Sequence, residues 1–492
     1  LRRLRNRPVN LLDNLDKAHR LYMPVHLRYF CQTGLCLHNR DSNMKFVTKI
    51  LAALLLASLS PPAAPDQVTE QVSQWRQSNE QQIIDRFAGL LRIPNVAADE
   101  VNIRKNADHI SQLLTDAGLD ARLLELKDSN PVVFAEKSVP GADKTIMIYI
   151  HYDGQPVNAA DWASDPWEPM MRTDMVEKGG KPVPMKAPFD PEWRIFGRSA
   201  GDDKAPIIAL HSALKAMEAA GIEPTVNLKV FMEAEEEAGS PNLRRMLETH
   251  SDQLTADLWL FCDGPTHQSR RWQLVYGVRG SYGFNLTVYG PNRPLHSGHY
   301  GNWSPNPIAM LTELIGSMRA TDGRILVDGY HEQVKPLSDA ELAAIAASPR
   351  MDEVLITDLG IGAPETEDRL ELAIARPAMN LRGISGGDVG AKARNAIQPS
   401  ASASIGLRLV PAQTPEYLRE VIEHPIRKQG YHILRAEPTT EQRQQQERLA
   451  RVNGSSSGGY PAYRASFDNP LAMQISTILG DLSDGTLIQT PT

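Results

Sequence analysis

Three consecutive glutamates, Glu235, Glu236 and Glu237, follow an apolar run at residues 226–232. The run predicts a buried strand, which places the three carboxylates at the carboxyl end of that strand. In open α/β sheets, this edge is where ligands bind. A run of glutamates alone is more often a solvated acidic turn. The chemistry therefore depends on which other side chains reach the same edge.

Histidine and further carboxylates stand where three other predicted elements begin or end. His151 and Asp153 close an apolar run at residues 145–150 and share one side of the strand. Asp202 opens a predicted helix, and Asp263 follows another apolar run. Singly, each has an ordinary interpretation as a surface pair, a helix cap or a turn. Together they predict one imidazole among hard carboxylate ligands, which suits a pair of divalent cations.

Length and charge limit the class of protein. The chain has 492 residues, enough for two or three domains, and a formal net charge of -7. Its apolar and charged fractions are those of a globular protein. The sequence beyond residue 43 is acidic and has no basic stripe, which argues against nucleic acid as a partner.

Residues 44–65 have the pattern of a secretory signal: a basic start, a short apolar core and then small residues and prolines. The core is too short to span a bilayer, and a buried helix is the alternative. We therefore expect an exported protein, periplasmic or secreted, with no stable membrane span after signal removal. Residues 1–43 are then upstream, non-native sequence. Cys262 becomes the one cysteine of the mature chain, so no internal disulfide is expected.

Predicted helices and strands alternate over the first half of the chain. We expect helices at residues 68–91, 101–117 and 207–217, and strands at 131–135, 145–150, 226–232 and 257–262. Another helix is expected to begin at Ser240 and Pro241, because serine is a common N-cap and proline fits the first helical position. This alternation predicts a layered α/β domain.

The pattern changes after residue 277. Strands with alternating polar and apolar residues are expected at 283–289 and 401–411, and helices at 306–318 and 416–422. Two strand–helix pairs predict a separate α+β domain inserted into the first. The expected division is a catalytic domain at 66–276, the inserted domain at 277–440 and the second part of the catalytic domain at 441–492.

Six motifs occur in the order seen in the M20 metallopeptidases, and the chain resembles that family over about residues 70–492. They are His-Tyr-Asp-Gly-Gln-Pro from His151, Gly-Arg-Ser-Ala-Gly-Asp-Asp-Lys from Gly197, Glu-Glu-Ala-Gly-Ser from Glu236, Cys-Asp-Gly-Pro from Cys262, Leu-His-Ser-Gly from Leu295, and Asn-Ala-Ile-Gln-Pro from Asn395 with Arg-Leu-Val-Pro from Arg408. The resemblance implies a layered α/β zinc-peptidase catalytic domain with an inserted α+β dimerisation, or lid, domain.

The same resemblance implies two divalent metal ions, with zinc expected and manganese or cobalt as alternatives. By that resemblance His151 and Asp263 bind one ion, Glu237 binds the other, and Asp202 bridges both. The peptide bond after Asp202 is expected to be cis, as in the family.

Catalytic and substrate-binding roles follow from the resemblance as well. Asp153 orients His151, and Glu236 is the general base that takes a proton from a metal-bridging water. His296 reaches across a homodimer into the partner's site and stabilises the oxyanion. Asn395 and Arg408 hold the substrate and its terminal carboxylate.

The expected reaction is metal-dependent hydrolysis of an amide next to a free carboxylate, in dipeptides or small peptides. Dipeptides are favoured because the Asp-Asp-Lys motif and the Leu-His-Ser-Gly motif look carnosinase-like. One alternative is a deacylase of N-acyl amino acids, of the acetylornithine or succinyl-diaminopimelate type. Another is a non-catalytic dimeric module that has kept the fold.

One ligand that the family uses is not found. The second metal site of the family takes a final histidine beyond a Gly-Gly-Ser turn, and no histidine follows His432 in this sequence. Glu237 and Asp202 would then be the only protein ligands of that ion, too few for zinc. We therefore expect a chain truncated at its C-terminus, whose residues 66–492 bind at most one metal tightly and show little hydrolysis.

Overall fold

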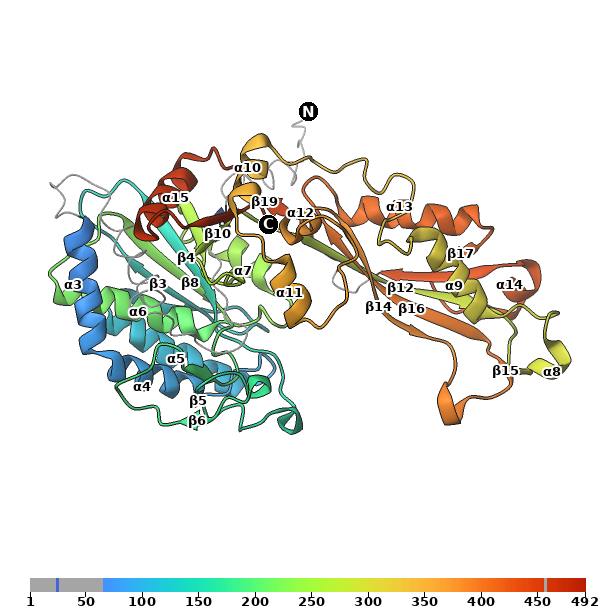
Figure 1. Ribbon diagram of the computed structural model, residues 1–492, viewed down its shortest axis with the longest axis horizontal. Helices are drawn as coiled ribbons and strands as arrows, with labels where there is room; N and C mark the ends of the chain where they lie inside the picture. The colour runs from blue at the N-terminus through green and yellow to red at the C-terminus, as the bar shows by residue number, and fades with distance from the viewer. Residues whose placement is uncertain (1–23, 26–64, 455–457) are drawn as a thin grey trace, which may run out of the picture. The chain divides into compact units, whose positions relative to one another are not determined.

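The computed structural model describes residues 24–25, 65–454 and 458–492. The chain divides into two compact units (Figure 1). The first comprises the chain up to Tyr276 together with Ala465–Gln489, and the second comprises Gly277–Arg464 with Thr490–Thr492. The second unit therefore interrupts the first along the sequence. The segments expected to be upstream sequence and a signal peptide lie almost entirely outside the described residues.

A six-stranded sheet forms the centre of the first unit. Its order is β1 (Pro24–Val25), β9 (Leu258–Phe261), β4 (Thr145–His151), β8 (Asn227–Glu233), β3 (Val132–Lys137) and β2 (Asp120–Leu124). β4 pairs in parallel with both β8 and β9, whereas β3 runs antiparallel to β8. β4, β8 and β9 therefore bring their carboxyl ends to one edge. Their nearly continuous apolar sequences fit strands that are covered on both faces.

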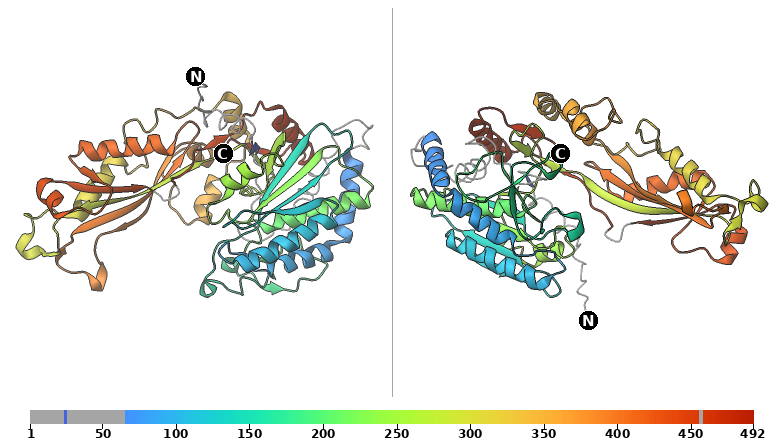
Figure 2. Two further views of the ribbon diagram at one scale, coloured as in Figure 1. Left: turned by 180° about the vertical axis from the view of Figure 1, so that it is seen from behind. Right: turned by 60° about the horizontal axis from the view of Figure 1, so that its bottom comes forward.

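Helices of the first unit pack along this sheet, and Figures 1 and 2 show α4, α5 and α6 side by side. The helices are α3 (Pro65–Ser78), α4 (Glu80–Leu91), α5 (Glu100–Asp116), α6 (Lys204–Ala219), α7 (Leu243–Thr249) and α15 (Pro470–Leu482). Among the described residues, no helix combines the length and apolar character needed to cross a membrane.

Two expected helices differ from the structure in detail. The helix expected at 68–91 is broken at Asn79, whose Nδ2 donates to the carbonyl of Trp75. The helix expected to begin at Pro241 begins at Leu243 instead. There Ser240 has a φ of 51°, and its amide donates to the carbonyl of Glu235 to close the acidic turn.

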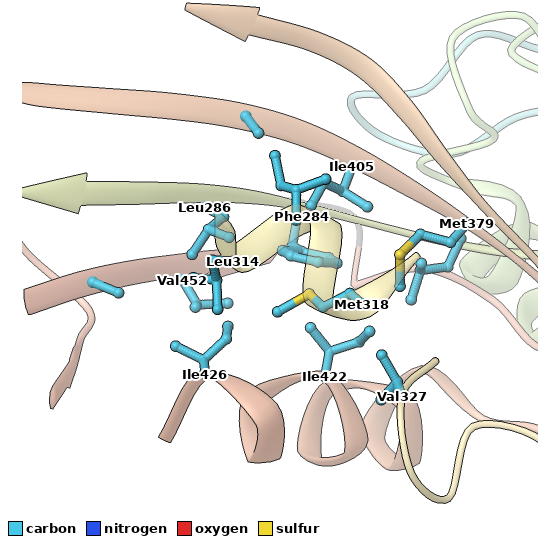
Figure 3. Packing of buried hydrophobic residues seen from close by; sticks show 14 of the residues in the cluster. Phe284, Leu286, Leu314, Met318, Val327, Met379, Ile405, Ile422, Ile426 and Val452 are labelled. Atoms are coloured by element: carbon cyan, nitrogen blue, oxygen red, sulfur yellow. The ribbon is translucent and has the colours of Figure 1, made fainter. Parts of the chain in front are cut away.

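The second unit contains a five-stranded sheet in the order β14 (Ala378–Ser385), β16 (Ser400–Leu409), β12 (Gly280–Tyr289), β18 (Leu449–Gly454) and β17 (His432–Leu434). Two helices, α9 (Pro307–Met318) and α13 (Pro415–Lys428), cover one face. Figure 3 shows Phe284 and Leu286 of the sheet packed against Leu314 of α9 and Ile422 and Ile426 of α13. Alternation along β12 and β16 leaves polar and small side chains on the opposite face, which we call the open face.

The inserted unit extends further than residue 440. β18 pairs antiparallel with β12 through the register Phe284↔Gly454 to Tyr289↔Leu449. Residues 441–464, expected to return to the catalytic domain, therefore lie in the second unit. A six-residue strand of mixed polarity gives a weak sequence signal.

Shorter elements complete both units. A three-stranded sheet, β6-β5-β7 (Pro182–Val183, Met170–Arg172 and Arg194–Phe196), forms in the segment between β4 and α6. Three strand pairs join β10 to β20 (Gln273–Val275 and Ile488–Thr490), β11 to β19 (Gly277–Val278 and Tyr463–Arg464), and β13 to β15 (Leu295–His296 and Ala396–Ile397). The remaining helices are η1 (Ala159–Asp161), η2 (Val176–Lys178), α8 (Ser297–Tyr300), α10 (Asp339–Ala347), α11 (Asp352–Asp358), α12 (Leu370–Ile374), η3 (Gly390–Lys392) and α14 (Thr440–Gln445).

Candidate metal centre

His151 ends β4 with its imidazole fully buried between two carboxylates. Its Nε2 lies 2.7 Å from Oδ1 of Asp202, and its Nδ1 lies 3.3 Å from Oδ1 of Asp153. Burial lowers the pKa of His151, but hydrogen bonds to these two carboxylates and the charges of Asp203 and Asp263 together raise it well above its ordinary value. The imidazole therefore occupies a strongly negative environment.

Asp203 joins the site, although the sequence did not single it out as a ligand. Ligand atoms of His151, Asp203 and Asp263 all lie within 4.8 Å of one another, and Asp202 is not part of this group. Asp203 is buried, its Oδ2 accepts the backbone amide of His151 at 3.3 Å, and its Oδ1 has no hydrogen-bond partner among the described groups. The Asp-Asp pair at the start of α6 was visible in the sequence, but spacing alone does not show that Asp202 contacts the imidazole while Asp203 accepts the backbone amide of His151.

The peptide bond between Asp202 and Asp203 is cis, as the resemblance implied. The bridging role predicted for Asp202 stays a prediction. Its position beside Nε2 of His151 is compatible with a shared ligand.

Asp153 holds the turn that carries the glutamates. Its Oδ1 accepts the backbone amide of Glu236 at 3.1 Å, and its Oδ2 accepts the amide of Glu237 at 3.0 Å. Gln155 donates from Nε2 to the carboxylate of Glu237 at 2.7 Å. Asp153, which is expected to orient His151, therefore also fixes the backbone of Glu236, the predicted base, and of Glu237, a predicted metal ligand.

Glu235 points away from this chemistry. Its Oε1 accepts the amide of Asn130 at 2.9 Å, and its Oε2 accepts Nδ2 of Asn242 at 2.9 Å. These contacts tie the acidic turn to the loop before β3 and to the start of α7. The third glutamate of the run therefore has a structural role.

Glu236 and Glu237 differ in what stabilises their charge. Burial raises the pKa of Glu236 to about 7, with His151 opposing the rise and Asp263 and Glu237 adding to it. Burial also raises the pKa of Glu237, which the hydrogen bond from Gln155 opposes. Several partly desolvated carboxylates and one imidazole leave negative charge that a divalent cation would neutralise. The donor set therefore fits a metal such as zinc.

A small-residue contact supports the end of β4. The side-chain Nδ2 of Asn95 donates to the backbone carbonyl of Tyr152 at 2.6 Å and to Oγ of Ser199 at 3.0 Å. The backbone carbonyl of Asn95 accepts the amide of Gly154. A Cβ at Gly154 would lie 2.3 Å from that Oγ. Glycine is therefore required where the chain leaves the metal centre.

The remaining predicted residues lie in the second unit. β13, which ends at His296, pairs with β15, which begins just after Asn395. The amide of Ser297 donates to the carbonyl of Asn395 at 3.0 Å, so the two predicted side chains come from adjacent backbone segments. His296 and Asn395 are exposed, as is Arg408 on β16. Their predicted roles stay predictions.

The chain matches the family model of the peptidase dimerisation domain, M20_dimer, over residues 276–433. It is 28% identical over 370 residues to the Cys-Gly metallodipeptidase dug1 of Schizosaccharomyces pombe, covering 70% of this chain and 73% of that protein. It is 25% identical over 400 residues to the Beta-Ala-His dipeptidase of Homo sapiens, covering 75% of this chain and 74% of that one.

A similar fold is found in the M20 family metallo-carboxypeptidase Sso-CP2 of Sulfolobus solfataricus. The TM-score is 0.65 at 25% identity, and the match covers 83% of this chain and 85% of that one. The predicted combination of an α/β catalytic domain with an inserted α+β domain is confirmed.

Proposed function

The chain carries an M20 peptidase dimerisation domain and is homologous to Cys-Gly metallodipeptidases and Beta-Ala-His dipeptidases, and from this premise we propose how its residues carry out metal-dependent dipeptide hydrolysis. The observation that carries the proposal is the group of His151, Asp203 and Asp263 at the carboxyl edge of the sheet, in which His151 and Asp203 are buried. Glu236 stands beside that group on a turn held by Asp153. Ligands and a separate base are both needed for hydrolysis by a metal.

Glu236 is the general base. Its pKa of about 7 suits a group that takes a proton from the attacking water, whose oxygen adds to the scissile carbonyl carbon, and then gives that proton to the leaving amine as the C–N bond breaks. Asp153 fixes the position of Glu236 through the backbone. A divalent cation, when bound, supplies Lewis-acid polarisation of the scissile carbonyl. His151 and the surrounding aspartates would hold that cation; His151 and Asp203 are buried, whereas Asp263 is partly exposed.

The metal is a divalent cation, and we propose zinc, with two ions as the family resemblance implies. His151 and Asp263 would hold one ion, Glu237 would hold the other, and Asp202 would be a ligand of both. The described residues form one group of three mutually close ligands, which contains His151, Asp203 and Asp263. We therefore expect at most one tightly bound ion per chain of residues 66–492 and little hydrolysis. Metal analysis after dialysis tests this, and two tight ions with fast turnover would contradict it.

The substrate is a dipeptide with a free carboxylate. Support comes from the relatives, which are named for Cys-Gly and Beta-Ala-His. A panel of dipeptides should be compared with N-acetyl and N-succinyl amino acids on the full chain supplied with zinc, manganese or cobalt, using micromolar protein so that slow turnover is visible. Dipeptides should be cleaved fastest. Preference for the acyl amino acids would make the chain a deacylase.

Two chains form a homodimer through the second unit, a proposal that the match to a dimerisation domain supports. In such a dimer His296 serves the partner's reaction. Mixing His296→Ala chains with Glu236→Gln chains should restore activity in the heterodimer, because one intact metal centre then receives an intact His296. Verified heterodimers without activity would contradict that role.

Export is proposed from the signal-like segment at residues 44–65. Expression of the full chain with its signal segment, followed by N-terminal sequencing of the recovered protein, tests the proposal. A mature N-terminus near residue 66 supports export, and retention of the segment inside the cell contradicts it.

A further inference from the structure

The backbone around His296 is fixed on both sides, although its side chain is exposed. His296 pairs with Ala396 where β13 meets β15. The amide of the next residue, Ser297, donates to the carbonyl of Asn395 at 3.0 Å. The amide of Gly301 donates to the carbonyl of Ser297 at 2.8 Å and closes the single turn of α8. The side chain of His296 therefore extends from a well-held backbone.

The imidazole of His296 is held as well. The backbone amide of Gly298 donates to its Nδ1 at 3.0 Å. The ring of His299 lies beside it, with 5.0 Å between the ring centroids and 33° between the ring planes. Nε2 of His296 has no hydrogen-bond partner in the part of the chain that the structure describes. The exposed ring therefore presents one free nitrogen, Nε2.

The hydrogen bond to Nδ1 decides which nitrogen carries the proton. A backbone amide can only donate, so Nδ1 of His296 must accept with a lone pair. In a neutral imidazole the proton is then on Nε2. Stabilising an oxyanion requires a hydrogen-bond donor aimed at the oxygen. The opposite tautomer would present a lone pair at Nε2 and repel that oxygen.

The close approach of Gly298 leaves no space for a side chain. A Cβ at this position would lie 3.0 Å from Cε1 and 3.1 Å from Nδ1 of His296, so the ring would have to move away from the amide. The simpler interpretation is that His296 only caps α8. Capping alone does not call for histidine, because serine, asparagine and aspartate are the preferred N-cap residues.

We propose that Gly298 is a positioning residue for His296, whose backbone amide selects the neutral tautomer with the proton on Nε2. In that form the imidazole donates a hydrogen bond to the oxyanion that arises when water adds to the scissile carbonyl. The inference rests on the proposed function, which gives His296 this role. The proton stays on Nε2 throughout, and the hydrogen bond weakens as the C–N bond breaks and the carbonyl forms again. Gly298 itself contacts no reacting atom.

NMR of the full chain labelled with 15N-histidine tests the tautomer without any turnover. The spectrum is recorded at about pH 8.5, where an ordinary histidine is neutral. The resonance of a ring nitrogen shows whether it carries the proton. Nε2 of His296 should be protonated and Nδ1 bare, whereas the exposed His432, whose side chain has no partner among the described residues, should show an average of both tautomers.

Two substitutions of Gly298 change the tautomer in different ways. Gly298→Ala displaces the ring, and Gly298→Pro removes the N–H, which the first turn of a helix tolerates. Both should shift the nitrogens of His296 toward the average seen for His432. The control is Gly316→Ala in α9, where a Cβ meets no atom within 4 Å, and it should leave them unchanged. Averaged tautomers in the wild type, or a spectrum that neither Gly298 variant alters, would overturn the proposal.

Steady-state kinetics connect the tautomer to the reaction. Gly298→Ala should lower kcat about 10-fold, a usual cost of losing a supporting hydrogen bond, with KM and bound metal unchanged. In a His296→Ala chain the same change should cost nothing further, because the amide has no imidazole left to hold. An equal second loss would make Gly298 structural and overturn the proposal.

A cap without a distant donor separates the two roles of His296. His296→Ser keeps an N-cap oxygen for the amide of Gly298 but has no group in the position of Nε2. It should be as slow as His296→Ala. Wild-type turnover in His296→Ser would show that α8 needs only a cap, and would overturn the positioning role.

Failure of the proposed function can be told apart from failure of this inference. A chain that cleaves no dipeptide, or a His296→Ala variant as fast as wild type, contradicts the proposed function. The NMR comparison of wild type and the Gly298 variants still decides whether Gly298 selects the tautomer. Averaged tautomers in a chain whose turnover depends on His296 contradict this inference alone.

Discussion

Oδ1 of Asp153 accepts a hydrogen bond from the backbone amide of Glu236 at 3.1 Å. The same oxygen lies 3.3 Å from Nδ1 of His151, so one buried carboxylate joins a metal ligand to the proposed base. Second-sphere carboxylates of this kind fix both the tautomer and the orientation of a ligating histidine. Here the carboxylate also sets the position of the acidic turn.

Asp153→Asn should therefore damage two functions at once. An asparagine presents an NH2 group where the aspartate accepts two amides and faces an imidazole, so one contact becomes repulsive. We expect metal affinity to fall about 10- to 100-fold, with a comparable loss of turnover. Metal titration of the apo-protein measures the first effect. The exposed Asp161→Asn change is the control, and equal affinities in the two variants would contradict the role of Asp153.

Glu237→Gln should weaken metal binding, whereas Glu235→Gln should not. Glu237 is the predicted ligand, while Glu235 accepts hydrogen bonds from Asn130 and Asn242. Replacing a charged acceptor by a neutral one should cost Glu235→Gln about 1 kcal/mol of unfolding free energy. Metal analysis and urea unfolding of both variants separate these effects. Metal loss in Glu235→Gln would mean that Glu235, and not Glu237, is the metal ligand.

Gly154→Ala should destabilise the protein by about 1–3 kcal/mol, the usual cost of overpacking. The new Cβ would approach Oγ of Ser199 to 2.3 Å. Ser199 has a φ of 61°, a conformation that glycine adopts easily, so Ser199→Gly in the same chain should recover part of the loss. Urea unfolding of the single and double variants checks this. Additive losses would show that the two residues do not clash.

Stability should fall as the pH drops below about 6.5, partly through His211. Burial lowers the pKa of His211, so the folded state binds fewer protons there than the unfolded state, and acid favours unfolding. The hydrogen bond from His211 lowers the pKa of Asp116, which adds stability that is lost at still lower pH. His211→Asn should make the loss between pH 7.5 and 5.5 smaller. The exposed His432→Asn change should leave that loss as in wild type.

Much of the fold was predictable because long apolar strands and amphipathic helices carry strong periodic signals. The strand ending at His151 and the helix beginning after Asp203 lie where the sequence predicted them. Short elements were missed, since β2 and β18 have no clear alternation. The helix predicted at 68–91 is interrupted at Asn79, and the helix predicted from Pro241 begins at Leu243. Local hydrogen bonds form at Asn79 and at Ser240.

The candidate site was predictable only as a set of residue types at one edge. Asp202 contacts the imidazole of His151 and Asp203 contacts its backbone amide, a tertiary arrangement that sequence spacing does not encode. The double contact of Asp153 with the glutamate turn is a tertiary feature between segments 83 residues apart.

The central claim is that a divalent cation held around His151 works with Glu236 as the base. The most direct measurement follows dipeptide hydrolysis by wild type and Glu236→Gln after chelator treatment and again after zinc is returned, with bound metal determined on the same samples. Hydrolysis by wild type should disappear with the metal and return with it, while Glu236→Gln binds the same metal but stays at least about 100-fold slower. Hydrolysis that persists without metal, or equal rates for both proteins at equal metal content, would contradict the account.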